Sequence, residues 1–218
     1  MRPKLFWAVA SGVSCALFFA VGCGSSSAHV RVLNAIPIQS SIDMLIDSKD
    51  IASSIPYGAA SGYLTVSSGS QHLQNEPSGS TPFVDQTISV SSGSYDTILD
   101  MASGATVLTD DNSAPASGDV KIRVVNASSN LGAPDIYVVT SSTGLGASPT
   151  FSSLRVSAAS GYDSVAAGSY QVYFVTPGTS NVILSTDALS FSSGQVRTVV
   201  VLDGETGGIT TSQLADLN

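Results

Sequence analysis

The chain has 218 residues, of which only 11% are charged, and its formal net charge is −8. This acidity argues against nucleic acid and anionic membrane surfaces as partners, because binding to either generally needs a basic patch. Apolar residues recur in short, regular runs, which argues against a disordered chain.

The first segment, residues 1–22, has the order of a secretory signal peptide. Arg2 and Lys4 form a positive head, and an uncharged apolar run follows from Leu5 to Phe19. Small residues then precede a cysteine, and the apolar run is short for a membrane span. We therefore expect an exported protein.

Ala20-Val21-Gly22-Cys23 resembles the lipobox of bacterial lipoproteins. In that family the peptide is cut before the cysteine, which receives diacylglycerol on its sulfur and usually an acyl chain on its new amino group. The resemblance makes Cys23 the expected lipidation site, and several acyl chains would hold the protein firmly at a membrane. The alternative is an ordinary cleaved signal peptide in which Cys23 is incidental.

Residues 23–29 follow as a flexible tether rich in Gly and Ser. Gly24 stands where an aspartate would resemble an inner-membrane retention signal, so the outer membrane or cell surface is the expected location. Because Cys15 would be removed with the signal peptide, Cys23 would be the only thiol. The exported part would then fold without disulfides.

The rest of the chain repeats itself. Ala-Ala-Ser-Gly-Tyr occurs at 59–63 and again at 158–162. Around each copy lies the same larger frame, for example Val30 to Ala35 and Ile122 to Ala127. We therefore predict two domains, 30–109 and 120–218, joined by a linker at 110–119.

Each repeat has the pattern of β-strands. Val120 to Val125 alternates in hydropathy, 136–139 and 170–175 are rich in β-branched and aromatic residues, and 198–202 is apolar on both faces. Glycine-bearing turns separate the runs every 8 to 12 residues or so. The sequence thus predicts an all-β fold of two tandem β-sandwich domains, immunoglobulin-like or transthyretin-like.

Several of these motifs resemble the bacterial family called domain of unknown function 4397. They are Arg123 to Ser128, Pro134 to Val138, Ala159 to Tyr162 and Ala167 to Tyr170. The family pattern runs Arg-Val-Val-His-Ala-Ser-Pro, then Val-Asp-Val-Tyr-Val, then Ser-Gly-Tyr and Ala-Gly-Thr-Tyr. The likeness covers nearly all of both repeats, with asparagine at 34 and 126 where histidine is common. It implies an envelope or secreted protein and no catalytic residues.

Catalysis is not expected from the sequence. The two histidines, His29 and His72, lie in the tether and in a strand that carries glutamine in the other repeat. No Gly-x-Ser-x-Gly elbow of a serine hydrolase occurs in the chain. We therefore expect a protein that is not an enzyme.

Calcium is the one cofactor that the sequence weakly suggests. Asp110 and Asp111 are adjacent at the junction of the repeats, with Asn112 and Asp119 nearby. Calcium needs several convergent hard oxygens, but the spacing here matches no known calcium loop. The simpler interpretation is solvated acids that cap turns.

Charged residues at matching positions of the two repeats have a structural interpretation and a functional one. Asp43 and Asp135 precede equivalent strands, where they could bind a ligand twice or accept hydrogen bonds from amides of the preceding turn. Arg31 and Arg123 are expected to pair with acids on a neighbouring strand.

The tyrosines of the repeated motif, Tyr63 and Tyr162, could serve as ligand platforms. The favoured expectation is that they fill the sandwich cores with their hydroxyls at the rim.

Two classes of function remain open. The first is a structural, adhesive or protein-interaction module that contacts other envelope or matrix components. The second is a ligand-binding module for glycans or another small ligand. Trp7, the one tryptophan, lies in the signal peptide, and its absence from the exported part lowers the second possibility.

Overall fold

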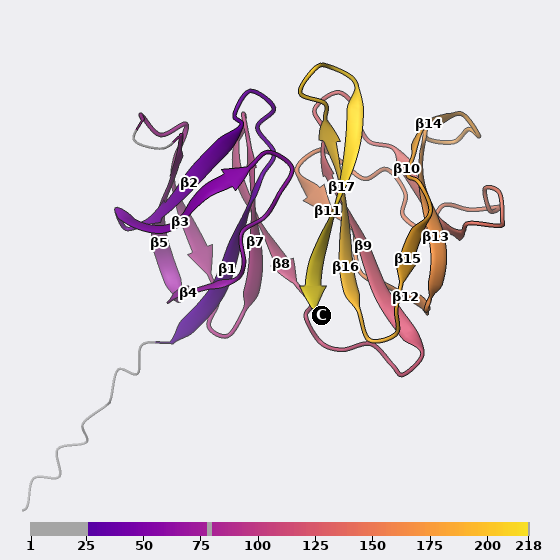
Figure 1. The fold of residues 1–218 in the computed structure, drawn as a ribbon, viewed down its shortest axis with the longest axis horizontal. Coiled ribbons are helices and arrows are strands. Elements are labelled where there is room, and N and C mark those ends of the chain that lie inside the picture. Colours follow the sequence, from indigo (N-terminus) through magenta and orange to yellow (C-terminus); the bar gives the residue numbers. More distant parts are fainter. Residues whose placement is uncertain (1–25, 78–79, 218) are drawn as a thin grey trace, which may run out of the picture.

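The computed structural model describes residues 26–77 and 80–217; the predicted signal peptide and Cys23 lie outside these ranges. Within them the chain forms seventeen β-strands and no helix, so the all-β prediction is confirmed (Figure 1). The described residues accordingly contain no helix able to cross a membrane. Figure 1 shows two upright halves side by side, which we call the N-terminal half (26–110) and the C-terminal half (119–217), joined by the linker 111–118.

The N-terminal half contains two four-stranded sheets. The first has the order β4-β1-β7-β8, with bounds Leu64–Ser67, Ser27–Asn34, Tyr95–Met101 and Gly104–Asp110. The second has the order β3-β2-β5-β6, with bounds Lys49–Pro56, Ser41–Ile46, Gly69–Glu76 and Val84–Val90. Strands β1 and β7 pair in parallel, whereas their outer neighbours pair with them antiparallel.

The C-terminal half repeats this plan with more irregular edges. Its first sheet has the order β11-β9-β16-β17, and β12 also pairs with β9; the bounds are Ala158–Ala159, Asp119–Ala127, Val196–Asp203, Ile209–Leu217 and Asp163–Ala166. Its second sheet has the order β10-β13-β14, with β15 also on β13; the bounds are Asp135–Thr140, Gly168–Val175, Val182–Ser185 and Leu189–Phe191. Strands β9 and β16 are parallel, as β1 and β7 are.

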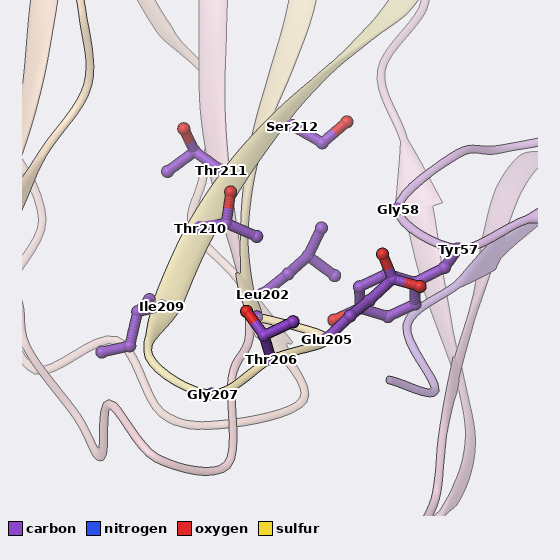
Figure 2. Close-up of a pocket in the computed structure, with 11 residues that line it drawn as sticks. Tyr57, Gly58, Leu202, Glu205, Thr206, Gly207, Ile209, Thr210, Thr211 and Ser212 are labelled. Atoms are coloured by element: carbon purple, nitrogen blue, oxygen red, sulfur yellow. The ribbon is translucent and has the colours of Figure 1, made fainter. Parts of the chain in front are cut away.

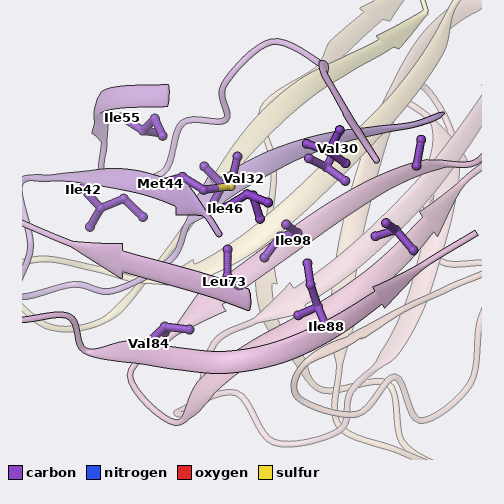
Figure 3. Packing of buried hydrophobic residues seen from close by; sticks show 13 residues of the cluster. Val30, Val32, Ile42, Met44, Ile46, Ile55, Leu73, Val84, Ile88 and Ile98 are labelled. Carbon is purple, nitrogen blue, oxygen red and sulfur yellow. The ribbon is translucent and has the colours of Figure 1, made fainter. Parts of the chain in front are cut away.

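Each half encloses its own apolar core between its two sheets. In β1 the alternate residues Val30 and Val32 point inward and are completely buried, where they contact Ile98 of β7 and residues of the facing sheet such as Leu73 (Figure 3). The C-terminal half has an equivalent core around residues such as Phe174. Full burial of one such aliphatic side chain stabilises a fold by about 1.5–3 kcal/mol.

A third apolar cluster lies between the halves. It joins the outward faces of β1, β7 and β8 to those of β9, β16 and β17. Strand β16 serves two layers, because Val199 and Val201 point into the C-terminal core while Val200 and Leu202 point into this cluster. The strand predicted over 198–202 is therefore confirmed, and its two apolar faces are explained.

The strands predicted over 120–125, 136–139, 170–175 and 198–202 fall inside β9, β10, β13 and β16. At the junction the structure differs slightly from the expected linker. Asp110 ends β8 and Asp119 begins β9, so both are strand residues.

Candidate functional site

A buried cluster of charged side chains lies between the two halves. Arg31 on β1 and Arg123 on β9 are 2% and 1% exposed. Each guanidinium forms an ion pair with an aspartate of the other half: Arg31 with Asp216 on β17, and Arg123 with Asp110 on β8. The expectation that these arginines pair with acids is thus met, but the acids lie across the interface and not on a neighbouring strand of the same sheet.

Both arginines also bind a backbone carbonyl across the interface. Arg31 Nη1 donates to the carbonyl of Ala215 at 2.9 Å, and Arg123 Nη1 donates to that of Thr109 at 3.1 Å. The two ion pairs form one cluster, since Arg31 Nη2 also lies 3.7 Å from Asp110 Oδ2. Two cations and two anions therefore balance each other inside the interface.

A threonine positions the arginine and the aspartate of each half. Arg31 Nε donates to Thr97 Oγ1 at 2.9 Å, and the Thr97 hydroxyl donates to Asp110 at 2.6 Å. The same contacts recur in the C-terminal half at 2.8 and 2.6 Å between Arg123, Thr198 and Asp216. Buried charges are stable only when their remaining hydrogen bonds are satisfied in this way.

The tyrosines of the repeated motif complete the cluster. The Tyr63 ring lies 4.7 Å from the Arg31 guanidinium, and its hydroxyl donates to Asp110 at 2.5 Å. Tyr162 repeats this with Arg123 at 4.8 Å and Asp216 at 2.9 Å. The expectation that these rings fill the sandwich cores is therefore wrong. The rings lie on the opposite face of the sheet, where a guanidinium offers a cation–π contact and a buried carboxylate accepts the hydroxyl proton.

Burial determines the ionisation of these groups. It raises the pKa of the Tyr63 and Tyr162 hydroxyls, and the adjacent carboxylates raise it further, so both tyrosines remain neutral donors. Burial alone would lower the pKa of Arg31, but Asp216, Tyr63 and Asp110 outweigh it and raise that pKa above its ordinary value. The cluster is suited to holding two surfaces together, because its polar groups are already bound to one another.

Asp43 and Asp135 have matching structural contacts. Asp43 Oδ1 accepts the amide N–H of Ser54 at 2.6 Å, and Asp135 Oδ1 accepts that of Ser153 at 2.8 Å. Both serines have positive φ, 54° and 48°, a conformation that non-glycine residues rarely adopt. The amides belong to segments that follow the aspartates, not to the preceding turn as expected. Gly178 also donates to Asp135.

The two aspartates considered for calcium do not converge. Asp110 lies buried in the interface cluster, whereas Asp111 is exposed and binds Lys121 Nζ at 2.6 Å and the Ser113 hydroxyl at 2.6 Å. These hydrogen bonds lower the pKa of Asp111 to about 2. In the described part of the chain, no group of three or more His, Cys, Asp or Glu side chains is placed to hold a metal ion.

The histidines lie on the surface of the N-terminal half. The His29 ring stacks on that of Tyr95, with centroids 4.5 Å apart. His72 Nε2 lies 2.6 Å from Asp85 Oδ1, and both side chains are about half exposed. This contact is a surface ion pair when the imidazole is protonated.

A cavity of about 470 Å³, the upper cavity, opens between the halves beside the hairpin joining β16 to β17 (Figure 2). The Tyr57 hydroxyl donates to the carbonyl of Asp203, and burial raises the Tyr57 pKa to about 12. The hairpin needs glycine at 204, because a Cβ there would lie 2.6 Å from the carbonyl oxygen of Gly207. The rest of the lining is rich in hydroxyls, from Thr206 and 210–212.

The lower cavity, of about 360 Å³, lies at the opposite end of the interface. Tyr63, Tyr95, Asn112, Ser113 and Asp216 line it. The two tyrosine rings meet edge to face, with centroids 5.2 Å apart. Its lining contains two aromatic rings, whereas that of the upper cavity contains one, Tyr57.

The sequence matches one family, described as "Domain of unknown function (DUF4397)", over residues 28–137. The chain belongs to this family. The match begins in β1 and runs through the N-terminal half, the linker and β9 into β10. No curated protein matches this chain.

Two solved structures are distantly similar to this DUF4397 protein. The Bacillus anthracis TIE protein is 8% identical over 87% of this chain, which spans 44% of its length, with a TM-score of 0.27. A structure described as alpha-glucan binding by a streptococcal virulence factor is 11% identical over 84% of this chain and 96% of its own, also with a TM-score of 0.27. At these TM-scores the likenesses carry no argument about fold or function.

The sequence interpretation missed the partners of the arginines. From the sequence, Asp110 is expected in a linker or as a calcium ligand, and no role is predicted for Asp216, Thr97 or Thr198. A signal was present, because Leu108-Thr109-Asp110 and Leu214-Ala215-Asp216 occupy equivalent strands. The two threonines also correspond, because Thr97 and Thr198 are the third residues of β7 and β16.

Proposed function

We propose that this protein is a non-catalytic interaction module displayed at the cell surface by a lipid on Cys23. In this proposal the halves are two tandem β-sandwich domains of immunoglobulin-like or transthyretin-like kind, and the second is a further, diverged copy of the family domain. The bound partner is another envelope or matrix protein. The internal repeat and the two separate cores support the domain assignment.

The placement of the loops relative to the tether carries this proposal. The described chain begins at the lower end of the molecule in Figure 1, whereas the loop from β1 to β2 and the hairpin from β16 to β17 lie at the upper end. The first of these loops presents Ile38, whose side chain is 83% exposed. A tether on residue 23 would direct these loops away from the membrane, where an exposed aliphatic side chain suits contact with a protein.

The anchor is tested by the Cys23→Ser substitution. We expect metabolic labelling with a fatty acid to disappear and the protein to leave the membrane fraction. Protease treatment of intact cells would show whether the protein is displayed on the cell surface. We expect cleavage, as for a protein on the outer face of an outer membrane, whereas protection would place it on an inner face. Lipid labelling that persists in the variant would contradict the anchor.

The interaction is tested by photo-crosslinking in intact cells. A photoreactive residue at Ile38 should capture one defined protein, and the same residue at Thr65, an exposed position on β4, is the matched control. The Ile38→Asp change should reduce capture from a photoreactive residue placed at Gln39. Equal capture from positions 38 and 65 would count against an upper-end partner.

A glycan-binding module is the second candidate, and the lower cavity favours it. Tyr95 is 37% exposed there, close to hydroxyl and amide groups, and aromatic faces bind sugar rings. A glycan array should then give hits that Tyr95→Ala abolishes and Tyr173→Ala, on β13 of the other half, retains. An array without hits would leave the protein-interaction module as the better candidate.

A further inference from the structure

The surface between the halves is built from the same face of each half. Its charged contacts occur twice with the halves exchanged: Arg31 binds Asp216 across the interface and Arg123 binds Asp110. The threonine and tyrosine contacts within each half repeat in the same way.

The apolar contacts follow the same symmetry. One cluster between the halves contains five equivalent pairs: Leu33 and Val125, Ala35 and Ala127, Leu99 and Val200, Met101 and Leu202, Leu108 and Leu214. Ahead of the repeated motif, Gly58 and Ser157 also correspond, with φ of 71° and 62°. A Cβ on Gly58 would approach Leu202, and the Ser157 hydroxyl contacts Met101 Sδ at 3.1 Å. An interface that has the same patch on both sides is isologous, the geometry of a twofold dimer.

The linker has its own hydrogen bonds at the edge of this interface. Lys121 Nζ binds Asp111 and Ser113, and the Gly118 amide donates to Ser193. These contacts are exposed, whereas the ion pairs are buried. The main attraction between the halves therefore comes from the matched faces, with the linker adding proximity.

We propose that this face is a docking surface for a second copy of the chain. In the complex, the N-terminal half of one chain binds the C-terminal half of the other and reproduces the contacts of the closed chain. The chemistry fits because each half offers one buried arginine, one aspartate and a matching apolar patch. This inference goes beyond the proposed function and does not depend on the lipid anchor.

Closure within one chain competes with this docking. A short linker gives the second half an effective concentration in about the millimolar range, without any new contact. At micromolar concentration the unmodified chain is therefore expected to be a closed monomer. Exchange between chains becomes visible when closure is blocked.

The test uses two variants of the chain that begin at residue 24 and contain both halves. Each variant disables one face. Leu108→Lys places a charge in the face of the N-terminal half, and Leu214→Lys does so at the equivalent position of the C-terminal half. Both residues lie on edge strands, β8 and β17, and neither belongs to the core of its own half. If either variant loses its β-sheet circular dichroism, Leu99→Lys and Val200→Lys replace the pair.

The variants carry different tags and are mixed, and the mass of the captured complex is measured by light scattering. We expect a 1:1 dimer of twice the chain mass, formed by the intact half of each variant. The double variant Leu108→Lys/Leu214→Lys should not join it. Homodimers without the mixed dimer would overturn the pairing of unlike halves, and monomers throughout would overturn the docking surface.

Discussion

At the scale of single residues, Asp100 and Asn75 are two polar side chains in the N-terminal core. Both are completely buried, and among the described residues neither carboxylate oxygen of Asp100 has a well-formed hydrogen bond. Strand pairing aligns them with Val201 and Phe174 of the C-terminal half, which are apolar. Burial raises the pKa of Asp100 to about 7, and the nearby Asn75 amide only partly opposes the rise.

This shift predicts that stability falls as pH rises from about 4 to 7. The unfolded chain releases the Asp100 proton near its ordinary pKa, whereas the folded chain retains it until about 7. Above pH 7 the cost approaches about 4 kcal/mol, from about 1.4 kcal/mol per pKa unit. Asp100→Asn should therefore be more stable than the parent at pH 8, with the difference vanishing toward pH 4.

Urea unfolding from pH 4 to 8 measures this difference. Asp96→Asn is the control, because Asp96 is also buried but its carboxylate is bound by the Ser94 hydroxyl at 2.5 Å. Parallel pH profiles for the parent and Asp100→Asn would show that this carboxyl does not titrate with folding.

The two interface tyrosines give a matched pair of substitutions. Tyr63→Phe and Tyr162→Phe each remove one hydroxyl from a buried carboxylate and keep the ring over its arginine. A hydrogen bond to a charged group contributes about 1.5–3 kcal/mol, so we expect similar losses of that size in the free energy of unfolding. Tyr95→Phe, on a half-exposed ring, should change little in the same urea titration. Unequal losses in the free energy of unfolding would show that the two hydroxyls do not contribute equally to the stability of the interface.

At the scale of elements, β16 is the strand on which two layers depend. Successive residues point alternately into the C-terminal core and into the interface, because strand side chains alternate between faces. Val199→Lys should unfold the C-terminal half, since a lysine cannot be paired inside that core. Val200→Lys should only separate the halves.

Two measurements distinguish these outcomes. Far-UV circular dichroism should fall for Val199→Lys and persist for Val200→Lys. Small-angle scattering should show a larger radius of gyration for Val200→Lys with both halves still folded. Loss of β-structure in both variants would mean that the C-terminal half cannot fold without its neighbour.

At the scale of the whole molecule, the buried ion pairs couple the unfolding of the two halves. Removing one partner of a buried pair costs about 3–5 kcal/mol, because a charge is left uncompensated. Replacing both Arg31 and Arg123 by Met leaves two unpaired aspartates in the interface. We therefore expect one calorimetric transition for the parent and two for the double variant. Arg155→Met, at an exposed position, is the control, and one sharp transition in the double variant would argue that apolar contacts alone couple the halves.

Much of the fold was predictable, because it follows from alternation within strands. Val30 and Val32 identify the inner face of β1 without reference to any other segment. The outer face was harder, since Arg31 is expected to pair with an acid on a neighbouring strand and Tyr63 to fill a core. Their actual place depends on the docking of one half on the other, which brings Asp216 to within bonding distance of Arg31 across 185 residues of chain. Local pattern carries no information about such a contact.

The crossed ion pairs have a consequence for how this sequence can diverge. Arg31 meets its acid in the other half, so we expect a change at 31 to need a compensating change at 216. We expect the same dependence between 123 and 110. We expect relatives that contain both halves to covary between 31 and 216 and between 123 and 110, more strongly than between 31 and 110 within one half.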